Sequence, residues 1–275
     1  MTTRILICDD SALARKQMAK ALPPGLADDI LFAGDGKEAL TILRDQKAEL
    51  LFLDLNMPEL DGYQVLEHIR SEDLPVLTIV VSGDIQPEAR ERVRKLGAID
   101  FIKKPTDTGV VSRLLKEYGF YRPSELEDTA LNDASLHSRE AAAPEISVSL
   151  SDYLQEISNV AMGRSSDLLA RLLKVFVKQP IPKVAFIANS ELHMAISAAQ
   201  RAENYSAVCQ GFTGAGIAGE ALLLFEDASF REMAELLHYD VLEGESVNVE
   251  VLMDMSSILF GAFIKGIGDQ LDLKL

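Results

Sequence analysis

The feature that most constrains this fold is the alternation, over residues 1–122, of short apolar runs with amphipathic segments. The apolar runs expected to form strands are 5–8, 29–33, 50–55, 76–81 and 99–102. The segments with a helical spacing of apolar residues are 12–22, 37–46, 63–70, 87–96 and 107–118. Buried strands separated by such helices form a parallel sheet that is covered on both faces. The sequence therefore predicts a doubly wound, five-stranded α/β domain with its site at the carboxyl ends of the strands.

Polar side chains stand where these runs end. Asp9 and Asp10 follow the first run, Asp54 closes the third, Ser82 follows the fourth, and Lys104 follows the fifth. Carboxylates that converge at one sheet edge raise one another's pKa unless a cation joins them. Mg²⁺ suits this place because it takes carboxylate ligands and bridges phosphate oxygens, while a lysine and a hydroxyl can contact a phosphoryl group. Strand-end acids can also be solvated loop residues, but the five residues together favour a magnesium site.

These residues, with the stretch DLNMPELDG at 54–62, resemble the receiver domain of two-component response regulators over residues 1–122. The resemblance implies a flavodoxin-like sheet, Mg²⁺ as cofactor, and phosphorylation of Asp54 by a sensor histidine kinase of the CheA type. The implied magnesium ligands are Asp9, Asp10, Asp54 and the backbone carbonyl of Asn56. The residues implied to contact the phosphoryl group, or to switch with it, are Ser82, Lys104 and Phe101. The resemblance also implies a cis peptide bond before Pro105.

The predicted helix 87–96 is unusually basic. Its basic residues are Arg90, Arg92, Arg94 and Lys95. A solvated face is the first interpretation of such a run, and a surface for docking a partner is the second. With Ser82 and Phe101, this helix is our candidate for the two-state element that responds to phosphorylation.

Charge and composition divide the rest of the chain. A length of 275 residues suggests two domains, and the net charge of −16 is spread unevenly, with −3 over residues 1–122, −5 over 123–150 and −8 over 151–275. Residues 123–148 contain two prolines, many small or acidic residues and no aromatic residue. Such a stretch cannot bury enough apolar area to offset its ordering entropy. We therefore expect an acidic flexible linker over 123–148 and a second domain over 149–275.

Composition also excludes several classes of partner. The acid excess argues against nucleic acid, because a phosphate backbone requires a dense cationic surface. No continuous apolar run approaches the roughly 20 residues that span a bilayer, and no signal peptide is evident, so no membrane partner is expected. Cys8 and Cys209 form no disulfide framework, which fits a cytoplasmic location.

The second domain has its most informative pattern at its start. Apolar residues over 149–177 follow a helical stripe, and Ser151 is a candidate N-cap. Asp152, Glu156 and Asn159 share one face of this helix. The pattern by itself favours a solvated helical face. No nucleotide-binding loop, metal-ligand spacing or helix-turn-helix motif accompanies it, and the glycine-rich stretch 211–225 favours a β-hairpin over a phosphate site.

This helix resembles the first signature helix of the CheC/CheX/FliY family, the phosphatases of chemotaxis response regulators. The family pattern is Asp or Ser, then Glu, then Asn, with a proline about twenty residues later. Here those positions are Asp152, Glu156 and Asn159, followed by Pro180 or Pro182. The resemblance implies that Glu156 pairs with the active-site lysine of a phosphorylated CheY-type receiver. It also implies that the Asn159 carboxamide orients the attacking water.

The remaining pattern predicts an α+β domain with an antiparallel sheet and two long signature helices. Strands are expected over 193–199, 205–213 and 217–225, a helix over 228–237, and the second signature helix over 249–265. In that helix the matching residues are Glu250, Asp254 and Ser257, so we expect a degenerate second site at Asp254 and Ser257. The family usually continues with a strand pair where this chain stops. We therefore expect either an incomplete C-terminal end or a sheet completed by a partner, which makes a homodimer plausible.

Three functional hypotheses follow. The leading hypothesis is a response regulator whose second domain hydrolyses the aspartyl phosphate of a CheY-type regulator. The first alternative is a non-catalytic module that docks a phosphorylated receiver or a flagellar-switch component. The second alternative is self-directed dephosphorylation, in which Glu156 and Asn159 act on the chain's own Asp54.

Overall fold

The computed structural model describes residues 3–26, 29–45, 47–121, 148–201, 205–214, 216–239 and 245–273. The chain divides into two compact units, Met1–Glu156 and Ile157–Leu275. The expected linker 123–148 lies almost wholly outside the described residues, so its flexibility stays a prediction.

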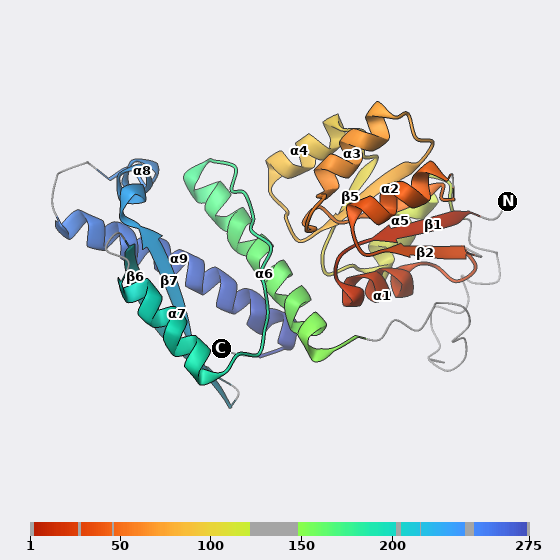
Figure 1. The fold of residues 1–275 in the computed structure, drawn as a ribbon. Coiled ribbons are helices and arrows are strands. Elements are labelled where there is room, and N and C mark those ends of the chain that lie inside the picture. The colour runs from red at the N-terminus through yellow and green to blue at the C-terminus, as the bar shows by residue number, and fades with distance from the viewer. Residues whose placement is uncertain are drawn as a thin grey trace. The chain divides into compact units, whose positions relative to one another are not determined.

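The first unit contains the five-stranded parallel sheet that the alternation predicts (Figure 1). Its strands are β1 (Arg4–Cys8), β2 (Asp29–Ala33), β3 (Leu50–Leu53), β4 (Leu77–Ser82) and β5 (Asp100–Lys103). Their order in the sheet is β2-β1-β3-β4-β5, and each neighbouring pair is parallel. The helices between and after them are α1 (Ala12–Ala21), α2 (Gly36–Arg44), α3 (Gly62–Ser71), α4 (Pro87–Lys95) and α5 (Thr108–Glu117). The predicted doubly wound fold is confirmed.

Apolar side chains on both faces hold this sheet together. β3 is buried along its whole length, from Leu50 to Leu53, because one cluster of apolar side chains covers each face of the sheet. Leu51 and Leu53 belong to the cluster under α2 and α3, and Leu50 and Phe52 belong to the cluster under α1 and α5. This two-sided burial is why the strands are continuous apolar runs instead of alternating ones.

The second unit is built from helices and one hairpin. Its elements are α6 (Leu150–Leu173), which spans the division between the units, α7 (Asn189–Arg201), β6 (Tyr205–Gly214), β7 (Ile217–Glu226), the short 3₁₀ turn η1 (Asp227–Ser229), α8 (Phe230–Leu236) and α9 (Glu245–Leu271). β6 and β7 pair antiparallel, and Gly216 in their connection has a φ of 80°. The hairpin expected over the glycine-rich stretch and both long helices are confirmed.

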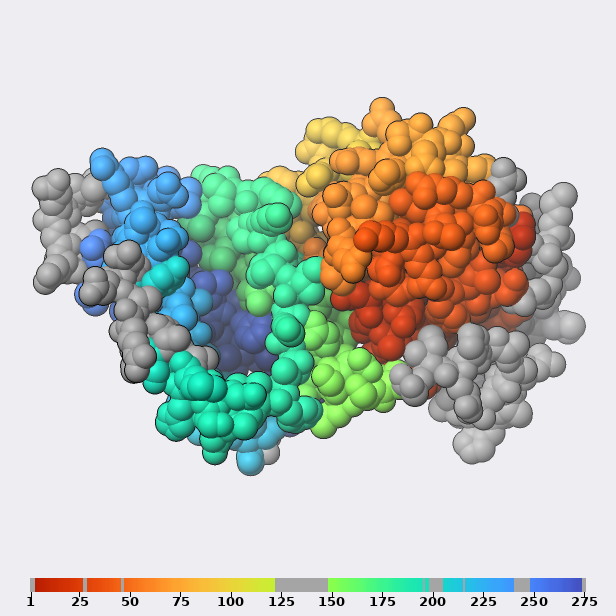
Figure 2. All heavy atoms as spheres, in the orientation of Figure 1, coloured from red at the N-terminus to blue at the C-terminus, as the bar shows by residue number. Residues whose placement is uncertain are grey.

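The strand expected over 193–199 is wrong, because these residues belong to α7, which Figure 2 shows at the surface. The described residues therefore contain a two-stranded sheet instead of a three-stranded meander. The physical reason lies just upstream. The Glu191 carboxylate accepts a hydrogen bond from the Ala188 backbone N–H at 3.0 Å, which satisfies a free donor at the helix start. The strand-like run over 193–199 was too short to outweigh this capping.

α6 and α9 pack closely against each other. A Cβ on Gly266 of α9 would lie 3.0 Å from both Cα and Cβ of Ala161 on α6, so glycine permits the helices to approach. The Gln270 side chain donates to the backbone oxygen of Ile157 at 2.9 Å, and Arg164 forms an ion pair with Asp269 at 3.3 Å. The C-terminal end of α9 is thus joined to α6 by small-residue packing and by polar contacts.

The expectation about membrane spans needs correction at α9. Residues Asn248–Leu271 are long and apolar enough to cross a bilayer by length and composition, with a mean hydropathy of 1.5 and a third of the window buried. A search for uninterrupted apolar runs missed this helix because isolated polar residues such as Asp254 and Lys265 divide it. Core helices of soluble proteins pass the same test, so this finding by itself assigns α9 to no environment.

Candidate functional site

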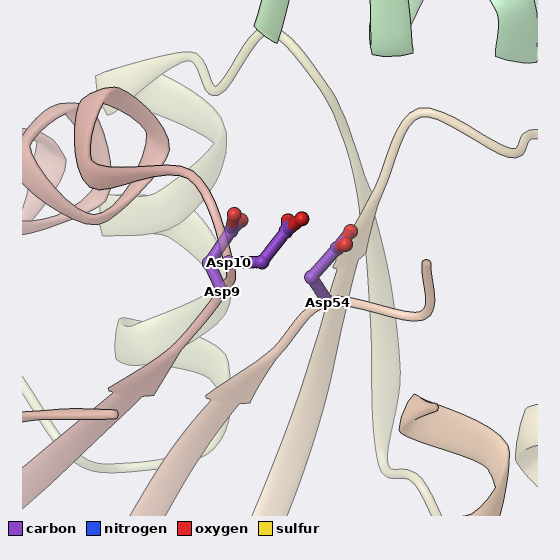
Figure 3. A group of neighbouring side chains, drawn as sticks. All are labelled: Asp9, Asp10 and Asp54. Atoms are coloured by element: carbon purple, nitrogen blue, oxygen red, sulfur yellow. The ribbon is translucent and has the colours of Figure 1, made fainter. Parts of the chain in front are cut away.

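Three carboxylates meet at the carboxyl edge of the parallel sheet (Figure 3). Asp9 and Asp10 directly follow β1, and Asp54 directly follows β3, its neighbour in the sheet. One oxygen from each side chain lies within 4.8 Å of the others. The arrangement that the strand ends predicted is therefore present.

The backbone places these acids. The Asp54 N–H donates to the Cys8 carbonyl at 2.9 Å, and the Asp9 N–H donates to the Ala33 carbonyl at 3.2 Å, so parallel pairing continues to the site itself. Asp9 Oδ1 also accepts from the Ser11 N–H at 2.9 Å. The main chain thus orients Asp9 from both sides, and its second carboxylate oxygen, Oδ2, faces Lys104.

Lys104 supplies the positive charge at this edge. Lys104 lies one residue beyond the end of β5, and its backbone N–H donates to the Ser82 carbonyl at 2.9 Å. The peptide bond from Lys104 to Pro105 is cis, as expected. The Lys104 ammonium lies 2.7 Å from Asp9 Oδ2 and 3.4 Å from Asp54 Oδ1. Lys104 is buried with both partners, so these ion pairs are shielded from solvent.

The electrostatics of the cluster reflect burial. Burial raises the pKa of Asp54 and Asp9 above the usual range, against the opposing attraction of Lys104. Burial and then the charge of Asp9 raise the pKa of Asp10 to about 6. Burial by itself lowers the pKa of Lys104, but the charges of Asp54 and Asp9 outweigh it and hold that pKa well above the usual range. The site concentrates negative charge that one lysine only partly compensates.

A divalent cation fits this donor set. Asp54 Oδ1 is buried and accepts no hydrogen bond from the described residues, while Asp54 Oδ2 accepts one from the Asn56 N–H at 3.1 Å. A buried carboxylate oxygen that meets only the ion pair with Lys104 can still take a metal ion, and Mg²⁺ prefers such oxygens. The acidic cluster is consistent with a magnesium site, and the role of the Asn56 carbonyl as a ligand stays a prediction.

Gly62 is a site residue that sequence reasoning missed. A Cβ at this position would lie 2.2 Å from the Asp54 carbonyl oxygen and 2.8 Å from the Leu55 Cα. The preceding residue, Asp61, caps α3 in a capping box with Gln64. Glycine therefore lets α3 begin directly against the backbone of Asp54 and Leu55. The signal in the sequence is a glycine immediately after an N-cap aspartate.

Ser82 and Phe101 lie on the neighbouring strands β4 and β5, and their roles as phosphoryl contact and switch stay predictions. Ser82 is fully buried at the end of β4, and Phe101 on β5 is half-buried. Two of the α4 arginines stack on aromatic rings: the Arg90 guanidinium carbon lies 4.9 Å from the Phe101 ring centroid, and that of Arg92 lies 4.0 Å from the Tyr63 centroid. Arg90 and Arg92 are exposed, so the solvated face expected for α4 holds for both, and each guanidinium also stacks on a ring of the domain itself.

The long helix expected at the start of the second domain is present as α6. Ser149, not Ser151, caps it, because Ser149 Oγ accepts from the Asp152 N–H at 3.1 Å and the Asp152 carboxylate accepts from the Ser149 N–H at 2.9 Å. Asp152 thus has a structural role at the helix start. Glu156 and Asn159 follow on the same helix, three residues apart and on one face.

Asn159 has a hydrogen-bonding partner that the sequence did not reveal. The Gln179 side-chain nitrogen lies 3.2 Å from both the backbone oxygen and Oδ1 of Asn159. On α9, the exposed Asp254 carboxylate accepts a hydrogen bond from the Tyr239 hydroxyl at 2.6 Å, and Ser257 is exposed. The two candidate sites therefore have different surroundings: the Asn159 carboxamide is held by an amide, whereas Asp254 is held by a phenol.

Comparison with known proteins identifies the first unit. Residues 5–116 match the response regulator receiver domain family, so this part of the chain is a receiver domain. The chain is 37% identical over 113 residues to protein-glutamate methylesterase/protein-glutamine glutaminase 3 of Geobacter sulfurreducens, covering 41% of this chain and 30% of that protein. It is 38% identical over 103 residues to the probable transcriptional regulator ycf27 of Porphyridium aerugineum, covering 37% and 42%.

Solved structures show similar partial coverage. The response regulator domain of Thermotoga maritima CheB is 27% identical, with a TM-score of 0.38, and the match covers 45% of this chain and all of that one. The chain spans less than half the length of the two curated relatives named above. The activities of those whole proteins therefore do not transfer to it.

Proposed function

Starting from a receiver domain at residues 5–116, we propose that this protein is a response regulator phosphorylated on Asp54 and that its second domain is an aspartyl-phosphate phosphatase. The proposed phosphodonor is a phosphohistidine on a sensor kinase of the CheA type. The proposed substrate is the phosphorylated aspartate of a CheY-type chemotaxis regulator. A cytoplasmic location is part of the proposal.

Phosphorylation of Asp54 requires positioning and charge compensation more than elaborate chemistry. A carboxylate oxygen of Asp54 attacks phosphorus while the bond from phosphorus to the histidine nitrogen breaks. Asp9, Asp10 and Asp54 would hold Mg²⁺, which neutralises charge on the transferring phosphoryl group. Lys104, with its ammonium 3.4 Å from Asp54 Oδ1, is placed to contact a phosphoryl oxygen, and Ser82 offers a hydroxyl.

The phosphatase proposal rests on one observation, the placement of Glu156 and Asn159 on a single face of α6. A phosphorylated receiver already carries Mg²⁺ and a lysine at its acyl phosphate. What remains is to place a water in line with the bond between phosphorus and the aspartyl oxygen. The neutral Asn159 carboxamide can do so without repelling the phosphoryl charge, while Glu156 pairs with the lysine of the target in a charge-assisted contact.

The test measures phosphate loss from a purified, separately phosphorylated CheY-type receiver. The added protein carries Asp54→Ala, so that it neither competes for phosphate nor reports on its own site. We expect acceleration that disappears with Asn159→Ala and persists with Asn189→Ala, a matched change at an exposed asparagine on α7. Acceleration that survives Asn159→Ala would refute the assigned role.

The same assay separates the alternatives. Binding to the phosphorylated receiver without acceleration would favour a non-catalytic docking module, which includes docking of a flagellar-switch component. Faster phosphate loss from Asp54 in the wild-type chain than in the Asn159→Ala chain, with no effect on a separate receiver, would favour self-directed dephosphorylation. A concentration series of the wild-type chain distinguishes action within one molecule from action between two copies in a homodimer.

A further inference from the structure

The inference concerns Gln179, which lies in the irregular segment after α6. Gln179 is 8% exposed, and its side-chain nitrogen contacts Asn159 twice, at 3.2 Å from the backbone oxygen and 3.2 Å from Oδ1. Both hydrogen bonds that the Gln179 side chain makes to described residues go to this one residue, twenty positions earlier in the chain. Gln179 thus holds one residue, Asn159, by its backbone oxygen and by its side chain, and this pair of hydrogen bonds is called the clamp below.

The geometry fixes which way both amides face. Nitrogen and oxygen of an amide side chain have nearly the same size, so their assignment rests on their partners. A backbone carbonyl only accepts, so the Gln179 atom beside the Asn159 carbonyl is its NH₂ group. The same NH₂ group contacts the end of the Asn159 side chain, so the Asn159 atom there is Oδ1. The main chain therefore sets Gln179, and Gln179 sets Asn159.

This arrangement leaves the Asn159 carboxamide in one orientation. Gln179 occupies one lone pair of Oδ1, which leaves the Nδ2 donors and the second lone pair of Oδ1 available for a water molecule. The Gln179 oxygen, Oε1, is buried and has no hydrogen-bond partner among the described residues. A buried amide oxygen without a partner costs stability. The Gln179 side chain keeps its contact with Asn159 although its own oxygen is left without a partner among the described residues. A residue kept at a cost in stability is typical of a functional constraint.

We propose that Gln179 is a positioning residue that orients the Asn159 carboxamide for water activation, an inference that rests on the phosphatase function proposed above. The neutral amide is important, because a charged partner at this place would bring an extra charge close to the phosphoryl group. A glutamate at position 179 would present only acceptors to the backbone carbonyl and to Oδ1. The Asn159 carboxamide would then turn and offer its nitrogen to the glutamate.

The experiment uses the full chain with Asp54→Ala and compares Gln179→Glu and Gln179→Ala with the Gln179 protein. The substrate is a separately phosphorylated CheY-type receiver. We expect Gln179→Glu to lower kcat by about 10- to 100-fold with KM unchanged, because the Asn159 carboxamide would no longer hold the attacking water in line. The change should add nothing in an Asn159→Ala background. A protonated glutamic acid can donate, so the kcat of Gln179→Glu relative to the Gln179 protein should rise as pH falls, whereas the ratio for Gln179→Ala should stay flat.

The outcomes separate the two claims. If the Gln179 protein accelerates phosphate loss but Gln179→Glu matches it at every pH, the role of Gln179 is overturned and the phosphatase function stands. If the Gln179 protein gives no acceleration, the phosphatase function falls, and the catalytic role of Gln179 falls with it. Circular dichroism and the side-chain amide NMR signals of Asn159 show whether each variant folds. A shift of those signals in Gln179→Glu supports the clamp, and unchanged signals contradict it.

Discussion

Replacing Asp10 with asparagine should stabilise the receiver domain in the absence of metal. Burial and the charge of Asp9 raise the pKa of Asp10 from 3.8 to about 6. In the folded state Asp10 therefore holds its proton over a pH range in which the unfolded chain has already released it. Its contribution to stability is complete below pH 3.8 and is lost as the pH rises through about 6.

The size of the effect follows from the shift. A difference of about two pKa units corresponds to about 3 kcal/mol of differential free energy, and relaxation of the site reduces the measured value to about 2–3 kcal/mol. Above pH 6, Asp10→Asn should raise the free energy of unfolding by this amount. At pH 4, where both folded forms carry a neutral side chain, the two proteins should differ little.

The assay is urea unfolding in the presence of EDTA, at pH values from 4 to 8. Amide NMR signals from β3 report on the receiver domain separately from the second unit. Asp29→Asn, at an exposed position that begins β2, is the matched control and should change neither the stability nor its pH dependence. Equal pH dependence in Asp10→Asn and the wild-type chain would refute the argument from burial and charge. With saturating Mg²⁺ the order should reverse, because asparagine removes a charged metal ligand.

Three further predictions concern packing. Gly62→Ala should lower the stability of the receiver domain by about 2–3 kcal/mol in urea unfolding, because its methyl group would collide with the Asp54 backbone; an unchanged midpoint would contradict this. Tyr63→Phe should raise stability by about 1 kcal/mol, because the buried Tyr63 hydroxyl has no hydrogen-bond partner in the described part of the chain; a loss would indicate a bound water. Gly266→Leu should separate α6 from α9 and lower the thermal midpoint of the second unit, whereas Gly261→Ala, where no atom lies within 4 Å, should not.

The acidic site was predictable because its determinants are local. Asp9, Asp10 and Asp54 each follow an apolar run directly, and parallel strands bring their carboxyl ends to one edge. Strand order did not have to be known, since any doubly wound order places all the ends on the same side. The cis peptide before Pro105 came from the family resemblance and was confirmed.

Contacts between distant segments could not be predicted in the same way. The stacking of Arg92 on Tyr63 and the clamp of Gln179 on Asn159 join residues 29 and 20 positions apart, and no periodicity reveals such pairs. The α7 error had another cause. Residues 193–199 form a short strand-like run, and the capping carboxylate of Glu191, which favours a helix, lies just outside that window. The pattern of apolar residues located a helix or strand well where the window also contained its capping residues, and poorly where it did not.

The contact between Gly62 and the Asp54 carbonyl has a consequence for the loop that joins them. The Gly62 N–H donates to the Leu55 carbonyl at 3.0 Å, so the loop is closed at its base by a hydrogen bond as well as by the close approach. Side chains within this loop can vary, but an inserted residue would have to move either the start of α3 or Asp54. The length of the stretch from Asp54 to Gly62 is thus as much a part of the site as the carboxylates are, and insertions will be tolerated elsewhere in the domain before they are tolerated here.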